Sequence, residues 1–370
     1  MKVLSIFGTR PEAIKMCPLV LTLAKTQGIE SVVCVTGQHR EMLDQVLDIF
    51  GVTPDFDLNI MRPRQTISTI TTSVINELDA VLEKAKPDVV LVHGDTTTSM
   101  AAALAAFYHQ IPVGHVEAGL RTYDRYSPFP EEMNRRLTSD IATYHFAPTK
   151  RNRAALEKES VDGQIYVTGN TVIDAFAYTI KPDYTFKNEQ LRAHDFSKPT
   201  ILLTAHRREN LGRPLENICK AVLALCEKHP DLRVVYPVHL NPAVRETVFP
   251  LLGEHPQITL GNPVDVEDMH NAMSQSFLIM TDSGGLQEEA PHLGKPVVVL
   301  RTETERPEAV EAGTAIVAGV EADAIFDIAE RLISDKQAYE AMSQAINPYG
   351  DGHASERIAA ALQNAEKNKE

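Results

Sequence analysis

The chain has 370 residues, of which 43% are apolar, and its formal net charge is -14 at pH 7. This length is enough to bury more than one hydrophobic core, so we expect two domains. The acidic balance argues against non-specific nucleic-acid binding, which needs a basic surface that neutralises phosphates.

Strand-like runs alternate with helix-length segments along the whole chain. The runs are KVLSIF, SVVCVT, DVVLVH and PVGHVE in the first half, then TILLTA, RVVYPV, SFLIMT and PVVVL in the second. Near-continuous runs of β-branched residues separated in this way are typical of parallel strands covered by helices on both faces. The sequence therefore predicts an α/β fold with two Rossmann-like, doubly wound domains. We expect them to join near residues 170 to 198 and to face a central cleft, the default ligand site.

The first predicted loop, FGTRPEAIKM, combines a helix start with two basic residues. Thr9 and Glu12 fit a capping box, and Pro11 suits a first helical turn. Capping explains neither Arg10 nor Lys15. Because positive charge is unfavourable at a helix N-terminus, Arg10 indicates a bound anion there.

Carboxylates of the first half follow predicted strands or turns in HGDTTT, HVEAGLR and SPFPEEMNRR. Asp95 ends a strand, where open α/β sheets bind ligands, although it could instead cap the next helix. Glu117 should be partly buried, which raises a carboxyl pKa and suits proton transfer; the alternative is a salt bridge with Arg121. Glu131 is a further candidate, whereas Glu132 fits the acidic first turn of a helix.

Two segments of the second half combine basic or glycine residues with strand ends. AHRREN places His206, Arg207 and Arg208 after a strand, which favours an anion site, and His239 in YPVHLNP repeats the placement. DSGGLQEE begins with Asp282, which could bind a ligand or cap a helix.

The glycines of DSGGLQEE allow close approach to a phosphate. Gly284 and Gly285 admit the backbone, and Ser283 adds a hydroxyl donor, so a pyrophosphate fits this turn. Either Glu288 or Glu289 can point inward toward ribose hydroxyls. Arg306, in ETERPE, can add charge at the same site, and together these features describe a nucleotide-sugar ligand.

The remaining features exclude other classes of site. Cys17, Cys34, Cys219 and Cys226 show neither a CxxC pattern nor His-rich spacing, so we expect core thiols, no disulfides and no metal. The longest apolar stretch is too short to span a bilayer, and no signal-peptide pattern begins the chain, so a cytoplasmic location is expected.

Eleven motifs in order resemble the bacterial non-hydrolysing UDP-N-acetylglucosamine 2-epimerases. They are FGTRPEAIKM, VTGQHREMLDQVL, LVHGDTTT, GHVEAGLRT, SPFPEEMNR, TGNTVID, TAHRREN, YPVHLNP, MTDSGGLQEEAP, TERPEA and NPYGDG. The resemblance covers almost the whole chain and implies a GT-B-like fold. It implies domains 1–170 and 171–353, with a helix at 354–370 that crosses back to the first domain.

The resemblance also assigns roles to individual residues. Catalysis would fall to Asp95, Glu117 and Glu131, with His206 assisting the departure of UDP. The residues implied in binding UDP are Arg10, Lys15, His206, Ser283, Gly284, Gly285, Glu289 and Arg306. The positions implied for a second UDP-N-acetylglucosamine, an activator, are Gln38, Glu41, Arg64, Glu131, Arg207 and His239. A homodimer is implied as well.

The implied reaction needs no cofactor. UDP is eliminated to give 2-acetamidoglucal and is then added back after protonation on the other face, which supplies a precursor of surface polysaccharide. The rivals are a hydrolysing epimerase, a GT-B glycosyltransferase, and a non-catalytic sugar-nucleotide sensor that would not need the three carboxylates. An NAD-dependent dehydrogenase is disfavoured by the missing glycine fingerprint.

Overall fold

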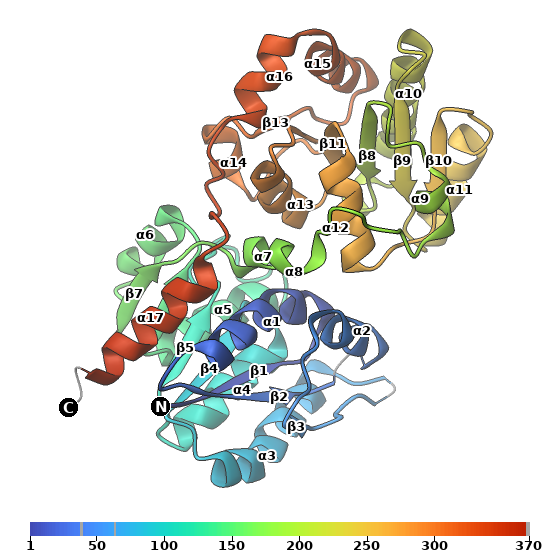
Figure 1. Cartoon of the computed structure of the whole chain (residues 1–370). Coiled ribbons are helices and arrows are strands. Elements are labelled where there is room, and N and C mark those ends of the chain that lie inside the picture. Colours follow the sequence, from blue (N-terminus) through green and yellow to red (C-terminus); the bar gives the residue numbers. More distant parts are fainter. Residues whose placement is uncertain (38–39, 63, 368–370) are drawn as a thin grey trace. The chain divides into compact units, whose positions relative to one another are not determined.

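The computed structural model describes residues 1–37, 40–62 and 64–367 and divides the chain into two compact units (Figure 1). The N-terminal unit comprises Met1–Tyr178 and Tyr349–Glu370, and the C-terminal unit comprises Thr179–Pro348. The chain therefore passes from one unit to the other twice, at residues 178–179 and 348–349.

The N-terminal unit is built on a parallel sheet with seven strands among the described residues, in the order β3-β2-β1-β4-β5-β6-β7. Its strands are β1 (Lys2–Phe7), β2 (Glu30–Val35), β3 (Phe56–Asp57), β4 (Val89–His93), β5 (Val113–Val116), β6 (Tyr144–Ala147) and β7 (Gln164–Val167). Its helices are α1 (Arg10–Lys25), α2 (Arg40–Phe50), α3 (Ile67–Ala85), α4 (Thr97–Tyr108), α5 (Glu131–Ile141), α6 (Lys150–Lys158), α7 (Thr171–Asp174) and α17 (Ala354–Lys367), with α8 (Phe176–Thr179) at the first crossing.

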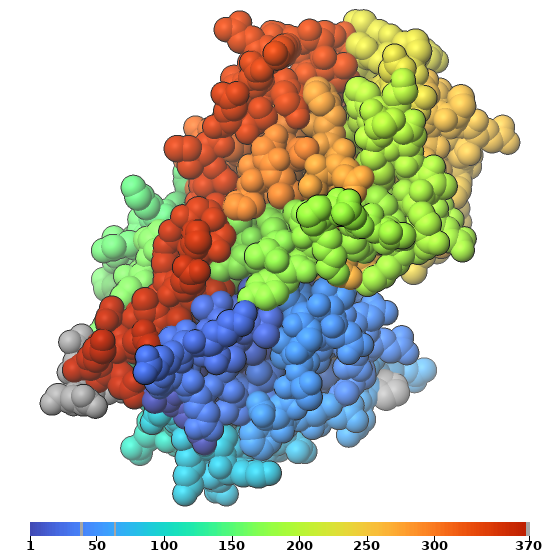
Figure 2. Space-filling model, viewed as in Figure 1, coloured from blue at the N-terminus to red at the C-terminus, as the bar shows by residue number. Residues whose placement is uncertain are grey.

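Helices cover both faces of this sheet because its central strands are apolar on both sides. In β1, Phe7 packs into one core, beneath α1 and α17, while Leu4 and Ile6 pack into another beneath α3 and α4. Helix α17 contributes Ile358 and Leu362 to the first core and lies along the N-terminal unit in the space-filling view (Figure 2). The doubly wound arrangement predicted from the sequence is confirmed.

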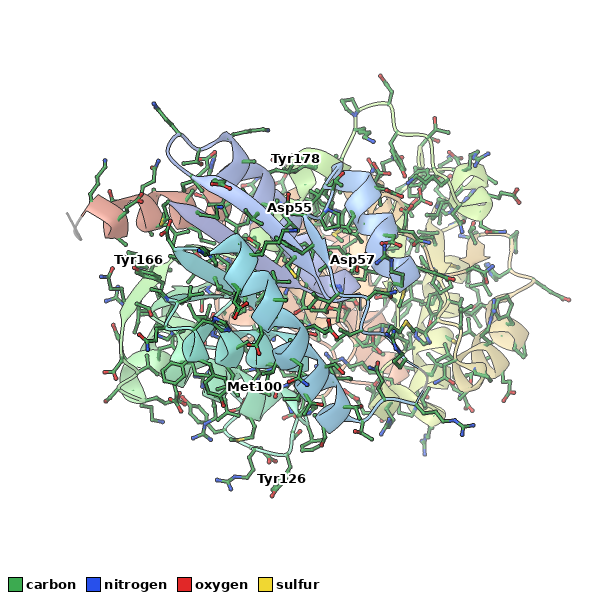
Figure 3. The ribbon with its side chains drawn as sticks, turned by 90° about the horizontal axis from the view of Figure 1, so that it is seen from below. Asp55, Asp57, Met100, Tyr126, Tyr166 and Tyr178 are labelled. Atoms are coloured by element: carbon green, nitrogen blue, oxygen red, sulfur yellow. The ribbon has the colours of Figure 1, made fainter. Side chains whose placement is uncertain are left out.

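Short polar contacts fix the edges of the unit. Asp55 accepts a hydrogen bond from the backbone of Val33 at 2.8 Å, and Asp57, the second residue of strand β3, forms an ion pair with Arg40. Asp55 and Asp57 are labelled in Figure 3. The capping box at α1 is also confirmed, since Thr9 and Glu12 exchange both bonds.

The C-terminal unit repeats the architecture with six parallel strands in the order β10-β9-β8-β11-β12-β13. Its strands are β8 (Thr200–Thr204), β9 (Arg233–Pro237), β10 (Ile258–Gly261), β11 (Leu278–Thr281), β12 (Val297–Val299) and β13 (Ala315–Val317). Its helices are α9 (Glu189–Ala193), α10 (Arg213–Lys228), α11 (Pro242–Leu252), α12 (Val266–Gln275), α13 (Gly284–Glu289), α14 (Pro307–Glu311), α15 (Ala322–Ser334) and α16 (Lys336–Ser343), with the 3-10 helices η1 (Arg208–Asn210) and η2 (Ala290–Leu293).

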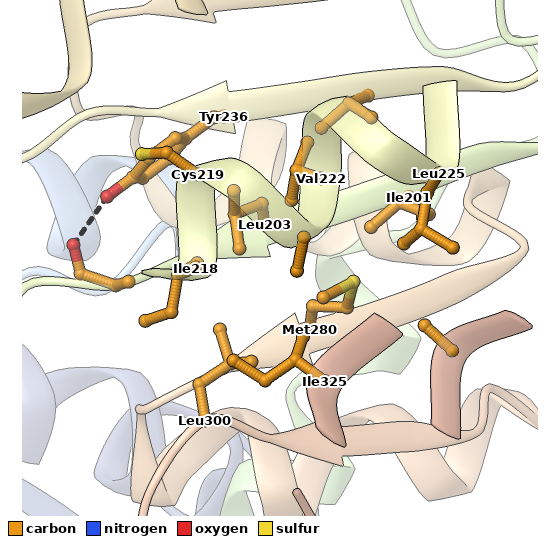
Figure 4. Packing of buried hydrophobic residues seen from close by; sticks show 14 of the residues in the cluster. Ile201, Leu203, Ile218, Cys219, Val222, Leu225, Tyr236, Met280, Leu300 and Ile325 are labelled. Carbon is orange, nitrogen blue, oxygen red and sulfur yellow. Dashed lines mark hydrogen bonds between the residues drawn. The ribbon is translucent and has the colours of Figure 1, made fainter. Parts of the chain in front are cut away.

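The core of the C-terminal unit packs α10 against the sheet. Ile218 and Val222 of α10 meet Leu203 and Met280 of the central strands (Figure 4). The buried Tyr236 satisfies its hydroxyl by donating to the carbonyl of Ala205 at 2.5 Å. The four cysteines are free and buried, so the expectation of core thiols is confirmed.

No helix in the described ranges combines the length and apolarity needed to cross a membrane. Within the same residues, no three His, Cys, Asp or Glu side chains are grouped so that they could hold a metal ion.

Gly119 is a position at which the fold tolerates no side chain. Its φ is +94°, and a Cβ there would lie 2.3 Å from the carbonyl oxygen of Asn152. We expect Gly119→Ala to lower the free energy of unfolding by about 2–4 kcal/mol, because backbone strain adds to a clash that no rotamer relieves. The control is Gly28→Ala, at φ +83° with no atom within 4 Å of the added Cβ, which should cost only about 1 kcal/mol. Urea unfolding compares the two; equal losses would show that the carbonyl of Asn152 can move.

Candidate active site

In each unit, the strand order reverses at the pair of strands whose carboxyl ends bear the sequence-predicted residues. The reversal lies between β1 and β4 in the N-terminal unit and between β8 and β11 in the C-terminal unit. Open parallel sheets bind ligands at such points, because the loops diverge there and leave a crevice. Arg10 follows β1, Asp95 follows β4, His206 follows β8 and Ser283 follows β11.

Glu117 lies just beyond β5 in a left-handed backbone conformation, with φ +62°. Such a conformation is uncommon for a residue with a side chain and tends to occur at functional sites. The side chain of Glu117 is only 16% exposed and forms an ion pair with Lys15. Its Oε2 also accepts a hydrogen bond from Asn170 Nδ2 at 2.9 Å and lies 3.6 Å from His93 Nε2.

These neighbours keep Glu117 ionised. Burial alone raises the pKa of this carboxyl, but the electrostatic influence of Lys15, then that of His93, holds the pKa well below its usual value. The expectation of a raised pKa is therefore wrong, because it considered only burial and not the effect of Lys15 and His93.

The expected alternative partner, Arg121, is engaged elsewhere. Its guanidinium binds Glu159 through Nε at 3.0 Å and Nη2 at 2.8 Å, and donates to Ser139 Oγ at 3.0 Å. The alternative of a salt bridge between Glu117 and Arg121 is therefore wrong, and the cation that pairs with Glu117 is Lys15, on α1.

Asp95 belongs to a second network, centred on Arg135 of α5. Arg135 Nη2 donates to Asp95 Oδ2 at 2.6 Å, and Nη1 donates to Glu132 Oε2 at 2.9 Å. The alternative that Asp95 caps α4 is wrong, because the N-cap is Thr96, whose hydroxyl accepts from Ser99. Glu131, the first residue of α5, has a buried Oε2 for which the described part of the chain offers no hydrogen-bond partner.

Glu132 is a structural carboxylate at the base of this network. It is fully buried, and its two oxygens accept the backbone N–H groups of Thr122 at 3.0 Å and Tyr123 at 3.1 Å. It therefore fixes the loop after Glu117 and pairs with Arg135 as well, which is more than the acidic first turn expected from the sequence.

In the C-terminal unit, Asp282 organises the loop that carries His206. Its Oδ2 accepts the backbone N–H groups of His206 and Arg207, both at 2.8 Å, and Asn210 Nδ2 at 3.0 Å. The alternative of a helix cap is wrong, because Ser283 is the N-cap of α13. The ring of His206 stacks on that of His239, with centroids 5.0 Å apart.

The electrostatic surroundings of His206 are mixed. Burial lowers the pKa of His206, Asp282 raises it, and His239 and Arg207 lower it further. His206 Nδ1 lies 3.7 Å from the buried Oδ1 of Asp282. The net result is a lowered pKa for His206, with burial as its largest cause.

The guanidinium groups of Arg207 and Arg306 lie beside the turn formed by residues 282–285. A Cβ built on Gly284 would lie 3.7 Å from Arg207 Nη2 and 3.8 Å from the guanidinium of Arg306, while one on Gly285 would lie 3.2 Å from Glu289 Oε1. Glycine thus leaves space between two guanidiniums and a carboxylate. The same backbone offers free N–H groups at the start of α13, so an anion is suited to this turn.

The two glutamates of DSGGLQEE both have partners in the C-terminal unit. Glu288 is 4% exposed and forms an ion pair with Arg306. Glu289 Oε2 lies 3.4 Å from Nε2 of the buried His270, whose Nδ1 is 2.7 Å from the hydroxyl of Thr179. Neither glutamate therefore lies on a solvated helix face.

The residues implied in activator binding are spread over both units. Glu41 lies in the first turn of α2, and Arg64 has φ +59° in the loop before α3. Arg207 lies 3.5 Å from Glu305, and His239 stacks on His206. Gln38 lies outside the described residues.

Four residues at these sites carried no assigned role in the sequence, namely His93, Arg135, Asn170 and His270. His93 precedes the GDTTT turn, and Asn170 belongs to TGNTVID, so proximity to a strand end was a usable signal. Arg135 and His270 lie inside helices, where nothing in the local sequence distinguishes a buried polar partner from a solvated one.

Two Rossmann-like units, one bearing the candidate carboxylates and the other an arginine-flanked glycine turn, define a GT-B-like α/β protein. The model of the family described as UDP-N-acetylglucosamine 2-epimerase matches residues 21–363. The chain belongs to this family and is accordingly an isomerase.

Relatives match along almost their whole length. The chain is 55% identical to the UDP-N-acetylglucosamine 2-epimerase of Bacillus subtilis, over 98% of this chain and 95% of that one. It is 53% identical to the enzyme of Escherichia coli K12, over 98% and 99%. The crystal structure of the UDP-GlcNAc 2-epimerase of Neisseria meningitidis matches with a TM-score of 0.88 at 51% identity, over 98% of this chain and all of that one.

Proposed function

We propose that the protein interconverts UDP-N-acetylglucosamine and UDP-N-acetylmannosamine by eliminating UDP to 2-acetamidoglucal and adding it back, without a cofactor. The observation that carries the proposal is the ionised Glu117, which pairs with Lys15, accepts a hydrogen bond from Asn170, lies near His93 and has a strained backbone conformation. The proposal is also supported by the Neisseria meningitidis relative, whose structure holds UDP-GlcNAc.

We assign to Glu117 the role of the base that removes the proton from the carbon bearing the acetamido group. When Glu117 takes this proton, the C–H electron pair forms the double bond to the anomeric carbon, and the anomeric C–O pair leaves with UDP. A carboxylate whose pKa is far below neutrality is a weak base. Substrate binding overcomes this weakness in the proposal. When the substrate diphosphate draws Lys15 away from Glu117, the pKa of Glu117 rises and the carboxylate becomes a stronger base.

The other carboxylates take complementary roles in the proposal. Asp95, held by Arg135, orients the sugar. Glu131, with its buried Oε2, is positioned to return a proton.

The C-terminal unit handles the departing UDP in this proposal. Arg306, with Ser283, Gly284 and Gly285, binds the diphosphate and stabilises the charge that grows on it as the bond breaks. His206 assists its departure, while Glu289 accepts hydrogen bonds from the ribose. Arg10, at the start of α1, adds charge to keep UDP in place for its return.

The cellular setting forms part of the same proposal. We assign the protein to the cytoplasm, in keeping with four buried free cysteines, and to supply of a precursor for bacterial surface polysaccharide. A homodimer and a second UDP-N-acetylglucosamine that acts as activator also belong to it. The activator residues that the structure describes are Glu41, Arg64, Glu131, Arg207 and His239.

The proposal is tested by incubating UDP-N-acetylglucosamine with the protein in heavy water, without nicotinamide cofactor. We expect UDP-N-acetylmannosamine to form and both sugars to gain deuterium at the acetamido-bearing carbon, since the abstracted proton exchanges with solvent. Mass spectrometry and proton NMR measure both, and an incubation without protein is the control.

Other products would support other activities. Free N-acetylmannosamine with stoichiometric UDP would replace the proposal by a hydrolysing epimerase. Transfer of N-acetylglucosamine to an acceptor without deuterium uptake would replace it by a glycosyltransferase. Unlabelled substrate alone would reject the assignment.

A further inference from the structure

The buried side chain of Asn170 makes one hydrogen bond through its amide oxygen and another through its amide nitrogen. It is 3% exposed and caps α7, its Oδ1 accepting the backbone N–H of Val172 at 3.1 Å. Its Nδ2 donates to Glu117 Oε2 at 2.9 Å. The cap fixes the amide plane, and the fixed amide in turn fixes one oxygen of the carboxylate.

The backbone of Asn170 is joined to the segment in which the chain returns from the C-terminal unit. Asn170 N–H donates to the carbonyl of Tyr349 at 2.7 Å, and Tyr349 is the first residue of the returning segment. Gly169 packs so tightly here that a Cβ would lie 3.2 Å from Gly350 Cα. Both glycines have positive φ, which permits this close backbone approach.

Helix α7 anchors the same returning segment a second time. Asp174 accepts the backbone N–H groups of Ala354 at 3.2 Å and Ser355 at 2.7 Å, at the start of α17. The position of Asn170 therefore depends on the returning chain on both sides of residue 350.

We propose that Asn170 is the positioning residue of Glu117 and ties this carboxylate to the segment that returns from the C-terminal unit. The inference deepens the proposed function and rests on Glu117 being the proton-transfer group. Asn170 acts through Glu117 and does not itself touch the reacting atoms.

A neutral hydrogen-bond donor such as the amide of Asn170 suits this position because Lys15 already supplies the positive charge beside Glu117. Among the described residues, the titratable groups that face Glu117 are Lys15 from α1 and His93 from the end of β4. Asn170 orients Oε2 without changing this balance. An aspartate there would keep the cap but set a second carboxylate against Glu117, which raises the pKa of the pair and loses the donor.

The test is Asn170→Asp, compared with wild type in the pH profile of kcat/KM for epimerisation. The acid limb should move up by at least about one pH unit, because Glu117 must be ionised to act. At neutral pH, kcat should fall roughly tenfold or more while UDP affinity is retained, since only the reacting carboxylate has moved.

Asn188→Asp is the matched control. Asn188 caps α9 in the same way, its Oδ1 accepting the N–H of Leu191 at 3.1 Å, in the C-terminal unit. The acid limb of this variant should match that of wild type. An equal shift of the acid limb in both variants would overturn the inference, because the shift would then come from the altered helix caps and not from the contact with Glu117.

Two further outcomes separate the inference from the proposed function. Wild-type protein that exchanges deuterium, together with an Asn170→Asp profile equal to that of wild type, overturns the inference alone. Wild-type protein without exchange removes the proposed function itself. Should Asn170→Asp not fold, Asn170→Ser retains a capping hydroxyl without the amide donor, and an unchanged kcat in that variant would overturn the inference.

Discussion

Glu117→Gln is expected to slow deuterium exchange and epimerisation by about 10²- to 10⁴-fold, the range that proton transfer by a positioned side chain contributes. The amide retains an oxygen that can accept from Asn170 but cannot take a proton. UDP affinity should not fall, because the substitution releases Lys15 from its carboxylate and leaves a cation for the diphosphate. Isotope exchange and calorimetric UDP binding, measured on the same preparation, test both parts.

Glu159→Gln is the control, because it removes a carboxylate whose ion pair has only a structural role. Glu159 pairs with Arg121 in the same unit. Its replacement should lower stability and leave exchange per folded molecule unchanged. A parallel loss of UDP binding and exchange in Glu117→Gln would instead make Glu117 a structural residue, paired with Lys15 to hold α1.

The fold could be predicted where its causes are local. The strands β1, β2, β4 and β5, and likewise β8, β9, β11 and β12, coincide with the apolar runs, because central strands buried on both faces are continuously apolar. The edge strand β7 shows no such run, since its residues are half exposed, and β3 has only two residues. Edge and short strands depend on their neighbours more than on their own sequence.

The partners of the candidate site residues could not be predicted in the same way. Lys15 and Glu117 are 102 residues apart, and only the strand order, which sets β1 beside β4 and β4 beside β5, brings them together. Burial of Glu117 follows from its sequence neighbours, but the sign of its pKa shift depends on whether a cation reaches the carboxylate. Arg121, four residues away, was the local candidate, and its side chain is bound to Glu159 instead.

Arg135→Met is expected to lower the free energy of unfolding by about 3–5 kcal/mol, the usual cost of removing one partner from a buried ion pair. Arg135 is 5% exposed, and the carboxylate that it leaves behind, Glu132, is fully buried. The methionine retains much of the side-chain volume, so the loss reports charge more than packing. Urea unfolding followed by circular dichroism measures it.

Arg153→Met is the comparison that separates buried from exposed pairs. Arg153 pairs with Glu157 on the surface of α6, with both side chains about half exposed, so its replacement should cost less than about 1 kcal/mol.

The double variant Arg135→Met with Glu132→Gln decides the cause of the loss. If an uncompensated charge is responsible, neutralising Glu132 should recover part of the stability, because a neutral amide can still accept one of the N–H groups of Thr122 and Tyr123. Epimerisation should not recover with stability, since Asp95 has lost the guanidinium that orients it. A double variant as unstable as Arg135→Met would mean that the aliphatic part and geometry of Arg135, and not its charge, hold the loop after Glu117 in place.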